Sequence, residues 1–286
     1  NGDGTLDIVN GMGIEEEQVG GVIALDGNDG AHLWQSNANA ELFATAQFND
    51  LNQDGTEDVI LGGRGHQLLA INGLTGDTIW TFDEANEGNG FTANNWFQFY
   101  TGQFIEDRDG DGVHDWLTAN GGDPSKGPGE ERQGGFIMII SGATGKIIAH
   151  ADTPDGRETY MSPIVYKPHA EMDTEILFGT GGETFDGRLW STSIEDIESG
   201  DISNSVMLIE PIEGVEKGVM APPAIADVTN DGILDIIAPT FDGRVVAIDG
   251  RNYSDIWTIN VREHAHEGDS TDVESYASPA IGYFTN

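Results

Sequence analysis

The chain has no cysteine, no long apolar run and few basic residues, with 12 lysines and arginines against 50 aspartates and glutamates. Without cysteine there are no disulfide bonds, which leaves the cellular compartment open. No stretch approaches 18 consecutive apolar residues, so we expect no transmembrane segment. No signal peptide is recognisable, but the chain starts inside a motif, so an upstream targeting segment stays an open alternative. The net charge of −38 disfavours binding to nucleic acid or to anionic lipid.

Glycine and aromatic residues are plentiful instead. The 286 residues include 40 glycines, 12 phenylalanines and six tryptophans, and the apolar residues fall in short runs. Short apolar runs bounded by glycine-containing turns are typical of β-strands rather than helices. We therefore expect an all-β fold.

Three acidic loops, residues 50–58, 107–115 and 227–235, share the pattern D-x-[DNT]-x-D-G-x-x-D. Oxygen side chains at positions one, three, five and nine can converge on one ion, and the glycine at position six permits the sharp turn. Hard oxygen ligands favour Ca²⁺ over Zn²⁺ or Cu²⁺. A fourth copy is cut off at the N-terminus, so we expect three to four calcium sites. The predicted ligands, position seven included, are Asn1, Asp3, Asp7, Asp50, Asn52, Asp54, Thr56, Asp58, Asp107, Asp109, Asp111, Val113, Asp115, Asp227, Thr229, Asp231, Ile233 and Asp235.

An EF-hand is excluded by the residues that follow these loops. An EF-hand needs a bidentate glutamate at position twelve and a flanking helix on each side. Position twelve is Leu61, Thr118 or Ala238, and runs such as 59–61 and 236–238 have strand character. We therefore expect each loop to join two β-strands.

The loops mark a repeat. Their fifth positions recur at Asp3, Asp54, Asp111, Glu171 and Asp231, at intervals of 51, 57, 60 and 60 residues. A second motif recurs in phase: an apolar strand, a D/N/S-G turn often closed by Thr-Gly, and a strand that carries tryptophan in three of four copies. The last repeat shows four expected strands, A to D, at 224–227, 234–238, 244–248 and 256–261.

Four antiparallel strands at this period describe a propeller blade. The sequence predicts one β-propeller domain of five four-stranded blades, with the tryptophans wedged between neighbouring blades. The repeats span about 1–43, 44–96, 97–160, 161–221 and 222–278. A closing strand within 279–286 would complete the first blade and remove two exposed edges. The alternative is a segment of a larger propeller with seven or eight blades.

In these motifs the chain resembles the FG-GAP/VCBS class of calcium-loop repeats, which integrin α-subunit propellers also contain. Its turns, such as residues 70–80, resemble PQQ-like propeller repeats. The resemblance implies a β-propeller and leaves the activity open. The fourth repeat departs from the pattern, because Lys167 stands at position one where a calcium ligand is expected, with His169, Glu171 and Glu175 after it.

Function is expected at the other end of the blades. The A–B loops and C–D turns share one end and are short, whereas the B–C and D–A connections are long and irregular, as binding loops are. Two D–A connections share a Glu-x-Tyr-x-Ser-Pro pattern. Their carboxylates and aromatic rings are suited to a sugar or a cationic ligand. The alternative is that the rings pack the strand entry and the carboxylates face solvent. The predicted ligand-binding residues are Glu158, Tyr160, Glu274, Tyr276 and Trp96.

The loop from Arg262 is the candidate for chemistry. His264 and His266 alternate, so on an extended segment both would face one side, suited to a transition metal or a proton relay. Arg157 or Arg262 would pair with a substrate carboxylate, and Tyr276 would act beside them. The alternative is that these histidines are idle surface residues.

These observations favour an extracellular or cell-surface calcium-binding propeller, with the periplasm as an alternative compartment. It would act as an adhesion or scaffold module for a glycan or protein partner, within a larger surface protein. Catalysis is left open but not favoured. The alternatives are a calcium-dependent, lyase-like enzyme acting on polysaccharide, and a quinoprotein dehydrogenase, which the lack of cysteine and the small number of blades disfavour.

Overall fold

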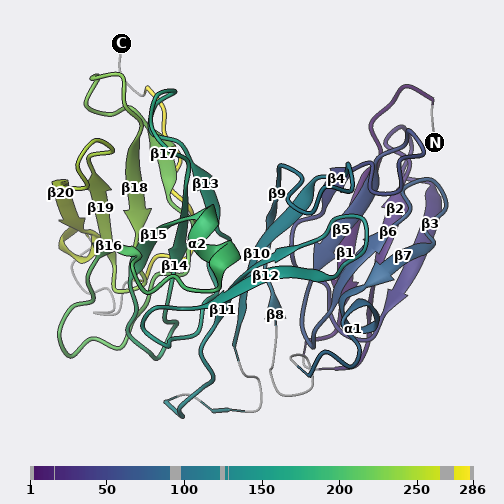
Figure 1. Cartoon of the computed structure of the whole chain (residues 1–286), viewed down its shortest axis with the longest axis horizontal. Helices are drawn as coiled ribbons and strands as arrows, with labels where there is room; N and C mark the ends of the chain where they lie inside the picture. The colour runs from purple at the N-terminus through teal and green to yellow at the C-terminus, as the bar shows by residue number, and fades with distance from the viewer. Residues whose placement is uncertain are drawn as a thin grey trace. The chain divides into compact units, whose positions relative to one another are not determined.

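The computed structural model of the chain describes residues 3–15, 17–90, 98–122, 126–127, 129–264 and 274–283. Contacts divide it into two compact units. The first comprises Asn1–Asp123 and Ile137–His150, and the second comprises Pro124–Phe136 and Ala151–Asn286. Each unit is built from antiparallel β-sheets (Figure 1).

The first unit contains two sheets and most of a third. The first sheet consists of β1 (Ile8–Gly13), β2 (Gly20–Leu25) and β3 (His32–Ala38). The second consists of β4 (Gln47–Asn49), β5 (Asp58–Gly62), β6 (Leu68–Ile71) and β7 (Thr78–Thr81). In the third, β8 (Gln98–Phe99) and β9 (Gln103–Ile105) both pair with β10 (Asp115–Gly121), and β11 (Phe136–Ile140) and β12 (Ile147–Asp152) follow in order.

The second unit contains two four-stranded sheets. One consists of β13 (Ile164–Tyr166), β14 (Glu175–Gly179), β15 (Leu189–Ser193) and β16 (Val206–Ile209). The other consists of β17 (Ala224–Ala226), β18 (Asp235–Pro239), β19 (Arg244–Ile248) and β20 (Asp255–Asn260). The spatial order of the strands follows the chain in both sheets. These are the meander sheets of a propeller-like architecture, and the all-β prediction is confirmed.

Helices are few and short in the described residues. They are α1 (Phe82–Ala85), α2 (Ile194–Ser199) and the 3₁₀ helix η1 (Val261–His264). Thr81 and Ser193 cap α1 and α2 by accepting a hydrogen bond from a first-turn backbone N–H. Within the described part of the chain, no helix is long and apolar enough to cross a membrane.

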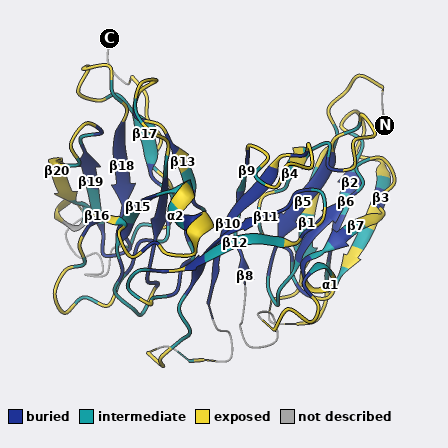
Figure 2. Ribbon diagram, viewed as in Figure 1, coloured by how far each residue is buried: buried dark blue, intermediate teal, exposed yellow. Residues whose placement is uncertain are grey.

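Neighbouring sheets pack face to face through the middle strands. β5, β10 and β18 are buried at every position (Figure 2). β5 and β18 are mainly apolar, whereas β10 also buries Asp115, Thr118 and Asn120. One core cluster joins the first two sheets, with Val22 and Trp34 against Val59 and Leu61. A second cluster joins the last two sheets and is centred on Tyr166, Leu177, Leu189, Ile236 and Val246.

The acidic loops lie where the sequence predicts them. Loop 50–58 joins β4 to β5, loop 107–115 joins β9 to β10, and loop 227–235 joins β17 to β18. In each case the loop closes an antiparallel pair, as Asn49 with Asp58 shows. Strands rather than helices flank the loops, so the exclusion of an EF-hand is confirmed.

The predicted closing strand is not seen in the described residues. Residues 279–283 form no strand, residues 284–286 lie outside the described range, and the first sheet has three strands. The blade count of the whole protein and closure of a ring therefore stay predictions. The prediction of closure rests on the argument that a closing strand would remove two exposed sheet edges.

Candidate metal centre and polar clusters

The first aspartate of each acidic loop organises the loop backbone. In loop 107–115 the Asp107 carboxylate accepts hydrogen bonds from the Gly110 N–H at 2.7 Å and the Gly112 N–H at 2.8 Å. Asp50 and Asp227 likewise accept a bond from the sixth residue of their loops, and their second donor is the fifth residue instead of the fourth. The donors hold the carboxylate toward the loop interior and lower the pKa of Asp107, Gly112 contributing most.

The ninth aspartate joins the loop to the following C–D turn. Asp115 Oδ2 accepts the Arg108 N–H at 2.6 Å, and its Oδ1 accepts the Gly142 N–H at 3.2 Å. Asp58 and Asp235 bond their own loops and turns in the same way, with Gly73 and Gly250 as turn donors. All three aspartates are buried. Burial raises the pKa of Asp58 and Asp115, and the amide bonds oppose that rise.

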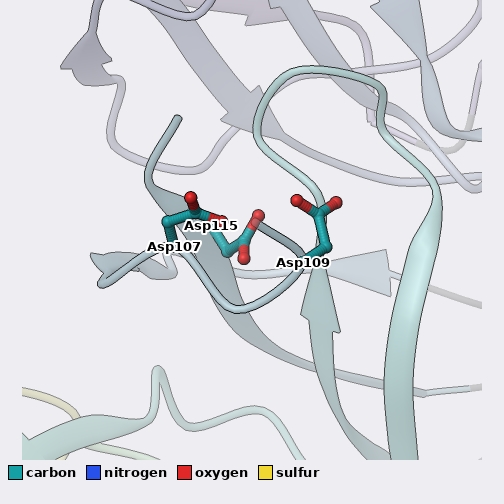
Figure 3. Close-up of side chains that lie close together, drawn as sticks. All are labelled: Asp107, Asp109 and Asp115. Carbon is teal, nitrogen blue, oxygen red and sulfur yellow. The ribbon is translucent and has the colours of Figure 1, made fainter. Parts of the chain in front are cut away.

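Three carboxylates converge in the loop 107–115. One oxygen each from Asp107, Asp109 and Asp115 lies within 4.8 Å of the others (Figure 3). Asp115 is buried at the start of β10, whereas Asp109 is exposed. These three side chains are the group of potential metal ligands, among the described residues, whose oxygens lie close enough together to share one ion. Its donors are hard carboxylate oxygens, the ligand type that Ca²⁺ prefers, with no sulfur or nitrogen ligand of the kind that favours Zn²⁺.

In the other two complete loops, a side chain of the following C–D turn contacts the aspartate at position five. In loop 227–235, the Arg251 guanidinium donates to Asp231 Oδ2 at 2.9 and 3.3 Å. This contact, with the Ile233 N–H, lowers the pKa of Asp231. In loop 50–58, Asn72 Nδ2 donates to Asp54 Oδ2 at 3.3 Å. At the ligand positions one, three, five and nine, both loops have one carboxylate fewer than loop 107–115, because Asn52 and Thr229 stand at position three.

The remaining predicted loop positions have mainly local contacts. Asn52 Oδ1 accepts the N–H of Asp54, and Thr229 Oγ1 donates to Asp227. The residues at position seven donate their N–H to the aspartate at position five, and these are Thr56, Val113 and Ile233. In the N-terminal copy, Asp3 Oδ2 accepts a bond from Asn28, and Asp7 Oδ1 accepts the Gly27 N–H at 3.3 Å. Asn1 lies outside the described residues.

A half-buried arginine and a buried glutamate form an ion pair at the predicted ligand end of the second unit. Arg132 Nη1 lies 3.2 Å from both Glu158 oxygens and donates to the Tyr160 hydroxyl at 2.8 Å. Arg132, Glu158, Arg157 and Phe185 line a pocket of about 60 Å³. The buried Arg132 Nε has no hydrogen-bond partner among the described residues. The carboxylate of Glu158 is therefore paired and buried, not solvated as the alternative expected.

A related cluster surrounds the second Glu-x-Tyr motif. Lys217 Nζ lies 2.6 Å from Glu274 Oε1, and the Tyr276 hydroxyl donates to Glu274 Oε2 at 3.1 Å. Lys217 also lies over the Phe241 ring at 4.9 Å, and this ring meets Tyr276 edge to face at 4.7 Å. Tyr276 is 63% exposed, so its ring is open to a ligand.

The first unit contains a third cluster of this kind. Arg64 Nε lies 2.9 Å from Glu41 Oε2, and its guanidinium lies over Phe43 at 5.7 Å. The sequence motifs did not point to the three cations Arg64, Arg132 and Lys217. The available signal was their rarity, because the chain has 12 basic residues and these three lie in B–C or D–A connections.

The predicted chemical loop is not extended where it is described. His264 is the last residue of η1, and it is exposed. The prediction of an extended segment is therefore wrong as far as His264, because η1 continues directly from β20 through Val261. His266, Trp96 and the side chain of Arg262 lie outside the described residues.

Solved structures with the same fold are distant in sequence. A quinohemoprotein alcohol dehydrogenase from Comamonas testosteroni matches with a TM-score of 0.59 and 13% identity over 87% of this chain and 42% of its own. A europium-containing methanol dehydrogenase matches with a TM-score of 0.55 and 12% identity over 84% and 47%. Sqt1 of Saccharomyces cerevisiae matches with a TM-score of 0.52 and 11% identity over 88% and 57%. This chain thus spans about half the length of these proteins, and the likeness shows the fold alone.

Sequence comparison gives the family. No curated protein matches the chain. The model of the FAM234A/B β-propeller matches residues 19–181, more than half of the 286 residues. The predicted propeller fold is thereby confirmed, while the resemblance to FG-GAP/VCBS calcium repeats stays a prediction. The chain belongs to the FAM234A/B β-propeller family.

Proposed function

We propose that this chain is a calcium-binding β-propeller that presents a binding surface for a glycan or protein partner outside the cell. The supporting observation is the convergence of Asp107, Asp109 and Asp115 within 4.8 Å. Asp107 and Asp115 hold the loop backbone around this point, and Asp109 projects from the same loop (Figure 3). Extracellular calcium modules bind with dissociation constants of about 10⁻⁴–10⁻³ M. A partly exposed site of this kind would therefore be occupied at millimolar calcium.

Calcium in this loop would act on the fold rather than on a reaction. Asp107, Asp109 and Asp115 would hold the ion, with loops 50–58 and 227–235 as weaker sites. The bound charge would offset repulsion between carboxylates that lie close together. Since the same Asp115 also bonds the C–D turn through Gly142, filling the loop would stiffen one end of the third sheet.

The partner would bind at the opposite end of the sheets, where the cation–carboxylate–aromatic clusters lie. Tyr276 offers an exposed ring beside Phe241, and Glu274 and Lys217 supply an acceptor and a donor next to it. An aromatic face beside fixed polar groups suits a sugar, because the ring contacts its apolar face and the polar groups bond its hydroxyls. The pocket of about 60 Å³ at Arg132 is small for a sugar ring and suits one substituent.

A glycan array with and without calcium tests this proposal. We expect calcium-dependent binding that Tyr276→Ala reduces at least tenfold. Tyr283→Ala removes a second tyrosine, which is fully exposed, and is the control that leaves binding unchanged. Equal loss in both variants, or no glycan or protein ligand in the presence of calcium, would contradict the proposed surface.

Catalysis by the same cluster is less well supported. A lyase would need a deprotonated base beside a cation. Partial desolvation and the hydrogen bond to Glu274 raise the pKa of Tyr276, so the phenol stays protonated at neutral pH. The names of two structural neighbours specify dehydrogenases, but at 12–13% identity this likeness carries no cofactor. We therefore propose binding rather than an enzymatic role.

A further inference from the structure

The small pocket at Arg132 is lined by residues of both charges. Its volume is about 60 Å³, and besides Gly156 it is lined by two arginines, two glutamates and one aromatic ring: Arg132, Arg157, Glu131, Glu158 and Phe185. All of these residues belong to the second compact unit. With Asp186, which pairs with Arg157, three negative charges lie near two positive ones. On a chain of net charge −38 this balance disfavours an anionic ligand, and the arginines disfavour a cationic one. The pocket therefore suits an uncharged polar group.

Arg132 supplies a hydrogen-bond donor to this pocket. Its Nη1 lies 3.2 Å from both oxygens of Glu158 and donates to the Tyr160 hydroxyl at 2.8 Å. One terminal nitrogen thus makes all three contacts, whereas arginine often binds a carboxylate through two nitrogens side by side. Among the described residues, none accepts a bond from Nη2 or from the buried Nε. The side chain is 19% exposed, so Nη2 is the donor left for a ligand oxygen.

Glu158 and Phe185 supply an acceptor and an apolar wall. Arg132 holds the Glu158 carboxylate in place, and each carboxylate oxygen has a further lone pair that can accept from a ligand N–H. The half-buried Phe185 ring lies under the Arg157 guanidinium, with 5.4 Å between the guanidinium carbon and the ring centre. Arg157 also pairs with Asp186, so its charge is already compensated. The pocket thus offers one donor, one acceptor and one apolar surface.

The volume of the pocket limits the size of the group that enters it. A cavity needs about 10–15 Å³ for each water-sized group, so about 60 Å³ holds roughly four to six of them. An acetamido group, with its nitrogen, carbonyl carbon, oxygen and methyl carbon, is of this size. It is uncharged and carries an acceptor, a donor and an apolar end. A hydroxyl group lacks the apolar end, and a carboxylate lacks the donor and adds negative charge.

We propose that this pocket receives the acetamido substituent of an N-acetylated sugar. The carbonyl oxygen accepts a hydrogen bond from Arg132 Nη2, the N–H donates to Glu158, and the methyl group contacts the Phe185 ring. The sugar belongs to the glycan of the proposed function, on which this step rests. Its ring stays outside the pocket, which is too small to enclose it.

A glycan array in calcium tests the substituent separately from the proposed function. It presents oligosaccharides of N-acetylglucosamine and N-acetylgalactosamine beside matched oligosaccharides of glucose, galactose and glucosamine. We expect the matched sugars to bind at least tenfold more weakly, because they leave the donor and acceptor of the pocket unpaired. Equal binding of acetylated and unacetylated sugars would overturn this step and leave the proposed glycan surface intact. Binding to no glycan would also overturn it, and a protein partner would then be the remaining form of the proposed function.

Arg132→Lys tests the donor. Lysine keeps a positive charge beside Glu158 but has no second nitrogen on a planar group. We expect at least tenfold weaker binding of the N-acetylated oligosaccharides and no change in Tm. Arg188→Lys is the matched control, because Arg188 pairs with Asp155 at the same 3.2 Å and does not line the pocket. Equal effects of the two variants on binding would contradict the assigned donor.

Saturation-transfer NMR on the native chain tests the methyl contact without any substitution. The ligand is free N-acetylglucosamine or N-acetylgalactosamine, whichever is the better binder on the array. We expect the acetyl methyl protons to receive more saturation than the protons of the sugar ring, and Phe185→Ala to remove this difference. A ring that receives as much saturation as the methyl group would show that the acetamido group does not enter the pocket.

Discussion

At the scale of single residues, aspartate has two roles in the acidic loops: it accepts structural hydrogen bonds, and we propose that it binds calcium. The aspartates at position nine are buried, and backbone N–H groups occupy both of their oxygens, as Asp115 shows with Arg108 and Gly142. Asp109 is exposed and belongs to the cluster that we propose binds calcium. Substitutions at the two positions distinguish these roles, because one should change the stability of the metal-free chain and the other mainly its calcium affinity.

Asp115→Asn is expected to destabilise the chain even without metal. The amide keeps one acceptor oxygen, so one buried N–H loses its partner, at a cost of about 1–3 kcal/mol. Asp109→Asn, at an exposed position, should cost less than about 0.5 kcal/mol. Urea unfolding of both variants in EDTA measures the difference. Equal stability of the two variants would show that Asp115 is not a structural aspartate.

Arg251→Gln is expected to strengthen calcium binding at the loop 227–235. The guanidinium contacts Asp231 Oδ2 at 2.9 Å and competes with a cation for the same carboxylate. Removing the positive charge frees the carboxylate for the cation, so we expect a few-fold gain in affinity. Calorimetric titration measures this, with the exposed Lys146→Gln as the control for net charge. Equal gains in both variants would exclude a local effect of Arg251.

The sequence predicts loop chemistry well and side-chain partners poorly. The pattern placed Asp107, Asp109 and Asp115 in one loop, because that spacing is local. It could not assign Arg132 to Glu158, 26 residues away, since that pairing depends on how two connections fold back on each other. It also treated position nine as a simple ligand, although tertiary hydrogen bonds occupy it.

At the scale of elements, the tryptophan contacts explain the recurring Thr-Gly turns. The second glycine of the turn has positive φ and lies under an indole, so it meets two requirements at once. The sequence predicted the wedging role, and Trp34 and Trp80 confirm it, because their indole N–H groups donate to the Gly73 and Gly142 carbonyls in the turns of the next sheets. The strands of the last sheet were also predicted to within a residue or two, because short apolar runs between glycine turns leave little freedom of register. The insertion of α2 after β15 was not predicted, since no repeat pattern marks it.

Gly76→Ala is expected to destabilise the chain more than Gly214→Ala. The two glycines have φ of +77° and +78°, so the backbone strain is the same, about 1–2 kcal/mol. A Cβ on Gly76 would lie 2.9 Å from Trp34, whereas one on Gly214 would meet no atom within 4 Å. We expect an additional cost of about 1–3 kcal/mol for Gly76→Ala. Thermal or urea unfolding compares the pair, and equal losses would mean that the indole contact contributes nothing to stability.

At the scale of the whole molecule, charge is the dominant feature. A net charge of −38 on 286 residues destabilises the compact state through self-repulsion, and bound calcium or salt relieves it. The family match shows the propeller fold, but the number of blades and the closure of a ring depend on contacts beyond the local pattern. The sequence predicts a repeat because the loop motif is local. It does not predict the number of repeats in the assembled protein, which depends on those longer-range contacts.

Calcium is expected to raise Tm, more at low ionic strength than at high. One site with tenfold excess of ion adds about 1.4 kcal/mol, which corresponds to about 2–4 °C per kcal/mol in a chain of this size. Differential scanning calorimetry in calcium and in EDTA, at two salt concentrations, measures the shift. An identical Tm in all four conditions would contradict calcium-linked stability.

Calorimetric titration of the metal-free chain with Ca²⁺ tests the central claim most directly. The account predicts saturable binding at submillimolar to millimolar concentration, with the tightest site lost in Asp107→Ala/Asp109→Ala and retained in Asp152→Ala, which removes an exposed carboxylate at the end of β12. Absence of saturable binding in the native chain, or the same binding curve for both variants, would contradict it.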